Sequence, residues 1–215
     1  MPEAPMMSAR QLAALCVASV GWAFGFGLGA PLASLWLQDA GASDTVIGLN
    51  TGVYYLGIAL AAGAVPWLMR HWGAGCLLLG MFASALTAAA FPWGGGLAGW
   101  FALRALNGGA AALSLIPLET FVNHRSPPEH RARNFGYYAF CIALGMALGT
   151  LVGLEMYAHR PRLAFLLGGA AAVVGGVVVL LWRPAPHVVI SCAQLGRSGP
   201  CRGRFDRLHA VIESG

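Results

Sequence analysis

Six long apolar stretches, separated by short polar breaks, fill most of this 215-residue chain. A helix needs about 20 predominantly apolar residues to cross the hydrocarbon core of a bilayer, and each stretch meets that requirement. A water-soluble domain of this size does not need so much uninterrupted apolar sequence. The sequence therefore predicts membrane spans over residues 11–37, 46–68, 73–92, 97–122, 134–156 and 162–182.

The composition favours a membrane protein built only from helices. Hydrophobic residues make up 58% of the chain and charged residues only 10%, whereas soluble domains carry about 25% charged residues. In lipid every backbone polar group must bond within the protein, so each span is expected to be a helix. Strands of a membrane β-barrel would alternate in polarity, and residues 162–182 do not. We expect an all-α polytopic fold embedded in the lipid bilayer.

The arginines indicate the orientation of the spans. All 13 basic residues are arginine, and most of them fall on one side of the predicted membrane. The positive-inside rule then places both termini in the cytoplasm, with the protein in a bacterial inner membrane. We interpret these charges as topology signals and expect no nucleic-acid partner. Outside the spans and the distal tail, the inner segments hold Arg10, Arg70, Arg125, Arg131, Arg133 and Arg183, and the outer loops hold Arg160 and Arg162.

The chain lacks the motifs of a metal site, a nucleotide site or an enzyme. Its five cysteines form no C-x-x-C pair, and no phosphate-binding P-loop occurs. Ser84 and Ser114 lack the sequence context of a membrane serine protease. We therefore expect no metal, no cofactor and no catalytic residues.

Residues 184–215 differ in character from the rest of the chain. They contain Gly, Arg and Ser without a long apolar run, so we predict a poorly ordered cytoplasmic tail. A truncated or frame-shifted reading frame would produce the same abrupt change in composition.

The distribution of polar residues predicts an internal repeat. The first, second, fourth and fifth spans carry polar groups or glycines at four-residue intervals, whereas the third and sixth carry almost none. Polar residues in lipid face the bundle interior or a water-filled cavity. We therefore expect the third and sixth spans to be peripheral, and the pattern predicts two three-helix repeats, an arrangement known in secondary transporters.

Several short motifs, in their order and spacing, resemble the amino-terminal half of the major facilitator superfamily. Residues 35–49 resemble its first outer loop and second helix, and residues 69–73 stand where its signature loop between helices 2 and 3 belongs, with Arg70 in place of an acidic residue. Residues 104–108 resemble the helix 4 motif, in which an arginine precedes glycine by four residues, and residues 129–136 the start of helix 5. Residues 145–153 resemble the helix 5 motif, with Thr150 in place of proline.

The resemblance implies a fold, an activity and a partner. Family members have twelve spans in two homologous halves that move a small solute between them by alternating access. A six-span chain would then act with a second half, either a second copy or a separate chain. The alternative is a truncated, non-transporting membrane fragment or a helper subunit. The gating-loop candidates that the resemblance supplies are Arg70, His71 and Gly73.

Arg104 is the leading candidate for a functional residue. It lies about seven residues into the fourth span, or roughly 10 Å deep. A charge at that depth costs several kcal/mol unless it is paired, hydrated or able to reach the interface. Either it binds an anionic substrate or a proton-coupling carboxylate, or it reaches outward or pairs with Glu155 or a backbone carbonyl. Glu119, near the inner end of the same span, is either a proton site or gate, or the ion-pair partner of a nearby arginine.

The remaining candidates are polar and small residues within the spans. Some could line a substrate path or equally form interhelical hydrogen bonds and interfacial anchors: Asn50, Tyr54, Asn107, Tyr137 and Tyr138. A ladder in the fifth span puts small residues on one helix face, which favours close packing of a neighbouring helix: Gly145, Gly149 and Gly153.

Overall fold

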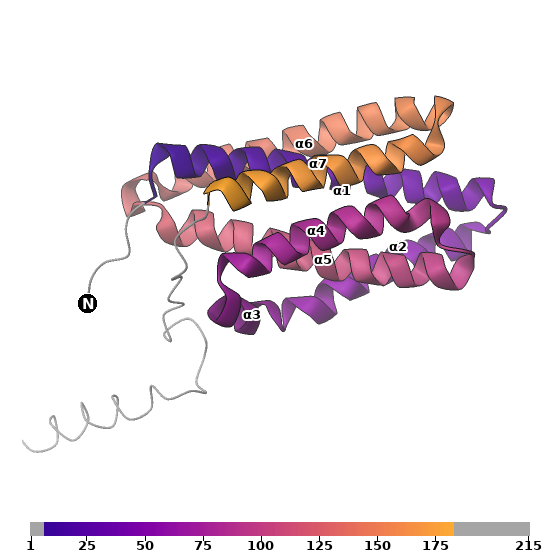
Figure 1. The fold of residues 1–215 in the computed structure, drawn as a ribbon, viewed down its shortest axis with the longest axis horizontal. Helices are drawn as coiled ribbons and strands as arrows, with labels where there is room; N and C mark the ends of the chain where they lie inside the picture. Colours follow the sequence, from indigo (N-terminus) through magenta and orange to yellow (C-terminus); the bar gives the residue numbers. More distant parts are fainter. Residues whose placement is uncertain (1–6, 183–215) are drawn as a thin grey trace, which may run out of the picture.

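The structure is a computed structural model that describes residues 7–182 and contains only helices over that range (Figure 1). Its α-helices are α1 (Ala9–Asp39), α2 (Asp44–Ala62), α3 (Val65–Trp72), α4 (Ala74–Ala90), α5 (Leu97–Arg125), α6 (Arg131–His159) and α7 (Pro161–Trp182). Two short 3₁₀ helices, η1 (Phe91–Trp93) and η2 (Pro128–His130), lie in the turns. The predicted tail, residues 184–215, lies outside the described residues.

Six of the helical segments are long and apolar enough to cross a membrane, which confirms the predicted all-α six-span fold. Their outer surfaces carry side chains that a soluble protein would bury. Leu60 is 73% exposed and Leu181 is 79% exposed. Contiguous exposed apolar surface of this kind marks contact with lipid or with another protein. The chain is an integral membrane protein.

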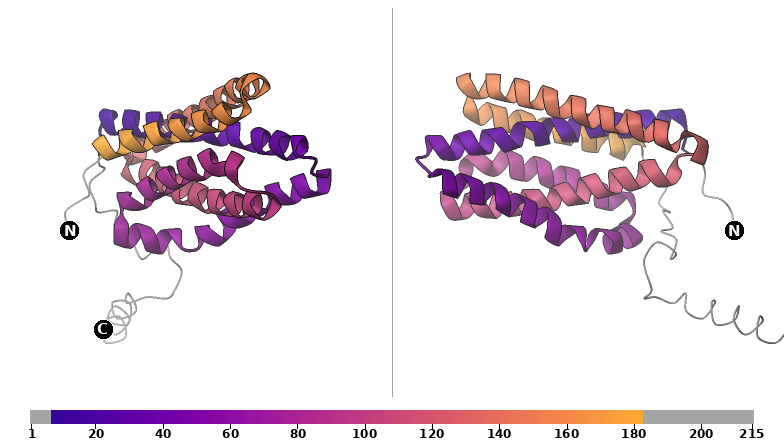
Figure 2. Two further views of the ribbon diagram at one scale, coloured as in Figure 1. Left: turned by 45° about the vertical axis from the view of Figure 1, so that its right-hand side comes forward. Right: turned by 180° about the vertical axis from the view of Figure 1, so that it is seen from behind.

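The helices run back and forth along one axis, so the turns gather at two ends (Figures 1 and 2). The start of α1, the α3 segment and the α5–α6 turn lie at one end. The α1–α2, α4–α5 and α6–α7 turns lie at the other. Among residues 7–182, most of the arginines near the helix ends therefore share the first end, whereas Arg160 and Arg162 stand at the second.

The packing repeats with the order of the helices. Helix α1 packs against α6 and α7, and α5 packs in the same way against α2 and α4. The main contacts are therefore preserved when α1, α2 and α4 are exchanged, in that order, with α5, α6 and α7. The α4–α7 contact joins the third helices of the two sets. This is the arrangement that two three-helix repeats require.

The second predicted span is broken in the structure. The sequence predicts one span over residues 46–68 and a turn over residues 70–73, but α2 ends at Ala62 and α3 follows. Pro66 is the physical cause, because a proline has no N–H to donate to the carbonyl four residues earlier and its ring clashes with that carbonyl. Arg70 and His71 accordingly lie in the last turn of α3, and only Gly73, with φ of 53°, leaves the helix.

The third and sixth spans, α4 and α7, are not peripheral within this bundle. They pack against each other, and each also packs against a first helix of a repeat, whereas α2 and α6 are the least buried helices. Small residues explain the difference: an added Cβ at Gly80 would lie 2.7 Å from the Leu113 carbonyl oxygen, and one at Gly169 would lie 2.9 Å from the Ala85 carbonyl oxygen. The scarcity of polar side chains in α4 and α7 reflects close packing by glycine and alanine.

The glycine ladder of α6 lies against α1. A Cβ added at Gly145 would lie 2.7 Å from the Val20 carbonyl oxygen, and one at Gly149 would overlap the Phe24 carbonyl oxygen. At Gly153 the neighbour is the Leu28 side chain, 2.8 Å away. The backbones of α1 and α6 approach one another so closely that these positions have no room for a side chain.

Candidate functional site

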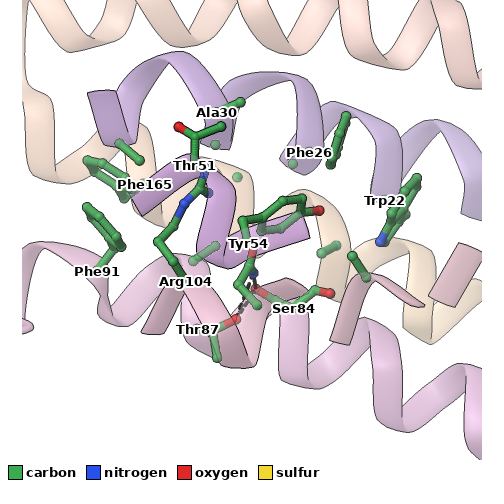
Figure 3. A pocket seen from close by; sticks show the side chains of 18 of the residues that line it. Trp22, Phe26, Ala30, Thr51, Tyr54, Ser84, Thr87, Phe91, Arg104 and Phe165 are labelled. Carbon is green, nitrogen blue, oxygen red and sulfur yellow. Dashed lines mark hydrogen bonds between the residues drawn. The ribbon is translucent and has the colours of Figure 1, made fainter. Parts of the chain in front are cut away.

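A cavity within the helix bundle is lined by polar and aromatic side chains together (Figure 3). It lies between α1, α2, α4, α5 and α7, and helix α6 contributes nothing to its lining. The space open to the centres of water-sized molecules is about 50 Å³, which is room for a few water molecules. The polar lining residues are Thr51, Tyr54, Tyr55, Ser84, Thr87, Arg104 and Asn107, and the larger apolar ones are Trp22, Phe26, Phe91 and Phe165.

Arg104 is the one charged side chain among the described residues of this lining, and it is only 5% exposed. Its guanidinium carbon lies 4.7 Å from the centroid of the Tyr54 ring, in a cation–π contact. Its Nε atom has no hydrogen-bond partner within residues 7–182. The described residues provide no carboxylate in the cavity, and Glu155, a possible partner predicted from the sequence, is exposed elsewhere on α6. A buried charge without a counter-ion costs about 3 kcal/mol or more in a membrane.

Asn107 lies one turn along α5 from Arg104 and is held by α4. Its Nδ2 atom donates to Thr87 Oγ1 at 2.7 Å and to the Ser84 carbonyl oxygen at 3.3 Å. The Thr87 hydroxyl in turn donates to the Ala83 carbonyl oxygen at 2.7 Å. These bonds tie α5 to α4 at the level of the cavity and fix the amide there.

Three buried polar atoms of the lining lack a hydrogen-bond partner within the described chain. They are Arg104 Nε, the Tyr54 hydroxyl and Ser84 Oγ. Buried polar groups in proteins are nearly always hydrogen-bonded, and each exception requires an explanation. All three can donate a hydrogen bond, so the residues lining the cavity hold donors that the described chain does not use. Figure 3 shows the Arg104, Tyr54 and Ser84 side chains around the same space.

The structure brings three of the predicted residues together and leaves the others elsewhere. Arg104, Asn107 and Tyr54 line the cavity, and the remaining candidates do not. Asn50 is buried on α2 with its Nδ2 atom unpartnered, and Tyr137 is 54% exposed.

Other predicted residues lie closer to the α5–α6 turn or in α3. Tyr138 is buried with its hydroxyl unpartnered, close enough to the half-buried Glu119 to interact with it electrostatically. Arg70 and His71 are exposed at the end of α3, where the His71 Nδ1 atom lies 2.9 Å from the Trp67 carbonyl oxygen.

Sequence reasoning missed the contributions of α4 and α7. Ser84 and Thr87 are the polar side chains of the third span, and their spacing of three residues puts them on one helix face. That spacing is the sequence signal from which a polar face on the third span could have been predicted. Phe91 and Phe165 stack with ring centroids 5.4 Å apart, but they come from segments remote in sequence, and nothing in the sequence pairs them.

Comparison with known proteins identifies the family. The family model of the Major Facilitator Superfamily matches residues 12–194. Over 163 residues the chain is 25% identical to the uncharacterized MFS-type transporter YfkF of Bacillus subtilis, a match that covers 75% of this chain and 41% of YfkF. It is 24% identical over 163 residues to the quinolone resistance protein NorA of Staphylococcus aureus, covering 74% of this chain and 42% of NorA.

A solved structure agrees with the fold. The crystal structure of the peptide transporter POT (E310Q mutant), in complex with sulfate, superposes with a TM-score of 0.68 and 18% identity, over 98% of this chain and 46% of that one. At that identity the likeness concerns the fold alone. The chain spans less than half the length of the relatives it matches. It belongs to the Major Facilitator Superfamily of membrane proteins.

Proposed function

We propose that this chain takes part in moving a small solute across a bacterial inner membrane, as half of a secondary transporter that works by alternating access. The observation that carries the proposal is the cavity at Arg104, whose lining holds a buried arginine and two buried hydroxyls without hydrogen-bond partners among residues 7–182. Such groups in a membrane interior mark solute or ion pathways. The relatives named as transporters support the same activity.

A second six-helix half is part of the proposal. The match covers about two fifths of each relative's length. Alternating access needs two bodies that rock against each other around a site. We propose that the second body is another copy of the chain or a separate six-span chain. We also propose that the arginine-rich end of the bundle, which holds α3, faces the cytoplasm, as the positive-inside rule predicts.

Flux through reconstituted vesicles tests the proposal. The 215-residue chain would be incorporated into liposomes and assayed with a panel of labelled anionic, neutral and cationic solutes, including a quinolone because NorA is named for quinolone resistance. We expect concentration-dependent uptake of at least one solute, with a loss of about tenfold or more in Arg104→Ala. Arg162→Ala, which removes an exposed charge from the first turn of α7, is the matched control.

The oligomeric state completes the test. Light scattering of the purified chain in detergent is expected to give a dimer, since one six-helix body cannot alternate by itself. A monomeric chain in vesicles that stay impermeant to the whole panel would contradict the proposal and favour a non-transporting helper subunit.

A further inference from the structure

Resting on the proposed function, we propose that the Arg104 cavity binds an organic monoanion: a planar acid group at Arg104, carried by an aromatic or apolar body that lies against the surrounding rings. The proposal names the chemical class of the solute. It depends on the charge, the hydrogen-bonding groups and the shape of the lining, which are taken in turn.

The charge of the lining selects one negative charge. Among its described residues, Arg104 is the single ionised group, and none is Asp or Glu. In a region of low dielectric constant an opposite charge is favoured and a like charge is disfavoured by several kcal/mol. A cation would meet Arg104 without a compensating carboxylate. A dianion would bring a second charge that the described lining does not match, so a monoanion fits best.

The unpartnered atoms select a group that accepts hydrogen bonds. Arg104 Nε can only donate, and the Tyr54 and Ser84 hydroxyls, both unpartnered, can donate as well. The guanidinium carbon lies over the Tyr54 ring, 4.7 Å from its centroid, and the Nε–H has no partner in the described chain. A guanidinium presents these N–H groups in a fork that matches the two oxygens of a planar oxyanion.

The rings select the body of the solute. About 50 Å³ of open space accommodates a group of the size of a few water molecules, so the acid group enters and the remainder lies along the lining. That lining is aromatic on both sides, with Trp22 stacked on Phe26 at 5.5 Å between centroids and Phe91 stacked on Phe165 at 5.4 Å. An aromatic or aliphatic body is stabilised there by apolar contact and by ring stacking.

The carboxylate that pairs with Arg104 could also belong to a protein rather than to a solute. A carboxylate side chain of a second six-span body could occupy the place of the solute and pair with Arg104. The two sources differ in a measurable way, because a soluble acid would then find the site closed in the dimer and Arg104 variants would weaken dimerisation.

Three probes of equal shape and different charge test the proposal: benzoate, benzamide and benzamidine. Binding to the purified full chain in detergent is measured by saturation-transfer NMR titration and by the thermal shift of the protein. We expect benzoate to bind at least about tenfold more tightly than benzamide, as charge-assisted hydrogen bonds imply, and benzamidine to give no specific signal. Phthalate, a dianion on the same ring, is expected to bind more weakly than benzoate.

Variants assign the preference to the cavity. Arg104→Gln is expected to bring benzoate and benzamide within about twofold of each other, since only the charge term is removed. Tyr54→Phe keeps the ring beneath the guanidinium and removes the unpartnered hydroxyl, so benzoate is expected to bind about three- to tenfold more weakly in a protein of unchanged fold. Arg162→Gln is the matched control and is expected to bind benzoate as the unaltered chain does.

The proposal is overturned by equal binding of benzoate and benzamide, by a preference that survives Arg104→Gln, or by benzoate affinity unchanged in Tyr54→Phe. It is also overturned if benzoate fails to bind and Arg104→Gln dissociates the dimer, which would assign the site to a protein carboxylate. Vesicles that transport only neutral or cationic solutes overturn the anion proposal and leave transport intact. Specific benzoate binding with vesicles impermeant to every solute supports the site and contradicts transport.

Discussion

The α1–α6 and α2–α5 crossings are equivalent, because each packs the first helix of one repeat against the second helix of the other, and both depend on glycines at backbone contact. On one side Gly149 of α6 lies against the Phe24 carbonyl; on the other Gly108 of α5 lies against the Tyr54 carbonyl and Gly57 of α2 against the Ala105 carbonyl. A Cβ at any of these three positions would overlap a backbone oxygen. The repeated crossing is therefore a scaffold element that the two halves of the bundle share.

The two crossings differ in the side chains that they place at the cavity. The α2–α5 pair holds Tyr54 and Arg104 in contact beside the cavity. The α1–α6 pair has no charged side chain in the cavity. One of its side-chain hydrogen bonds satisfies backbone: Pro31 of α1 leaves the Gly27 carbonyl without an intrahelical donor, and the Thr150 hydroxyl donates to that carbonyl at 2.9 Å. A further bond runs from the Tyr157 hydroxyl of α6 to Asp39 Oδ2 of α1 at 2.7 Å. The α1–α6 crossing supplies packing, and the α2–α5 crossing also places Tyr54 and Arg104 at the cavity, on the same backbone arrangement.

The largest effect is expected at the α1–α6 crossing. Gly149→Leu forces a side chain against the backbone of α1, which cannot yield as a flexible side chain can, so we expect a loss of about 3 kcal/mol or more in stability, or aggregation. Gly136→Leu is the matched control on the same helix, because nothing lies within 4 Å of a Cβ there. Thermal unfolding in detergent, with size-exclusion chromatography, measures both. Equal stability of the two variants would show that α1 and α6 are further apart than described.

At the α2–α5 crossing we expect smaller changes in stability, of opposite sign in two neighbouring glycine variants. Gly108→Ala places a methyl group on the Tyr54 carbonyl oxygen and is expected to destabilise the protein by about 1–3 kcal/mol. Gly109→Ala, at the next residue, meets its nearest atom, Ala61 Cβ, at 3.8 Å, which is an ordinary contact. There the better helix propensity of alanine is expected to raise stability by about 0.5–1 kcal/mol. Shifts of the same sign in the two variants would contradict the described register of α2 on α5.

The sequence predicts the spans of this molecule better than it predicts their packing. Length and apolarity define a membrane helix, so the six spans follow directly from the chain. Packing depends on which face of each helix meets a neighbour, and Tyr137 and Tyr138 illustrate this: adjacent residues point about 100° apart, so only Tyr138 is buried. Arg104 could be identified in advance because a charge in lipid is conspicuous in any sequence.

The cavity itself could not be predicted, because most of its lining is ordinary in composition. Trp22, Phe91 and Phe165 are aromatic residues of a kind found throughout the spans, and only the fold brings them to one place. The break between α2 and α3 was also missed, although its cause, Pro66, stands in the sequence. The apolar residues on both sides of Pro66 made residues 46–68 read as one continuous span.

The smallest effect distinguishes the roles of the two crossings most directly. Thr150→Val and Thr87→Val make the same change of a hydroxyl for a methyl group. The first leaves the Gly27 carbonyl without its donor, and the second removes the acceptor that Asn107 Nδ2 reaches at 2.7 Å. Each is expected to cost about 0.5–2 kcal/mol of stability in the thermal unfolding assay. Only Thr87→Val touches the cavity, so it alone is expected to change solute flux per folded molecule. A flux defect in Thr150→Val of the same size would mean that the α1–α6 crossing moves during transport and is more than a fixed support.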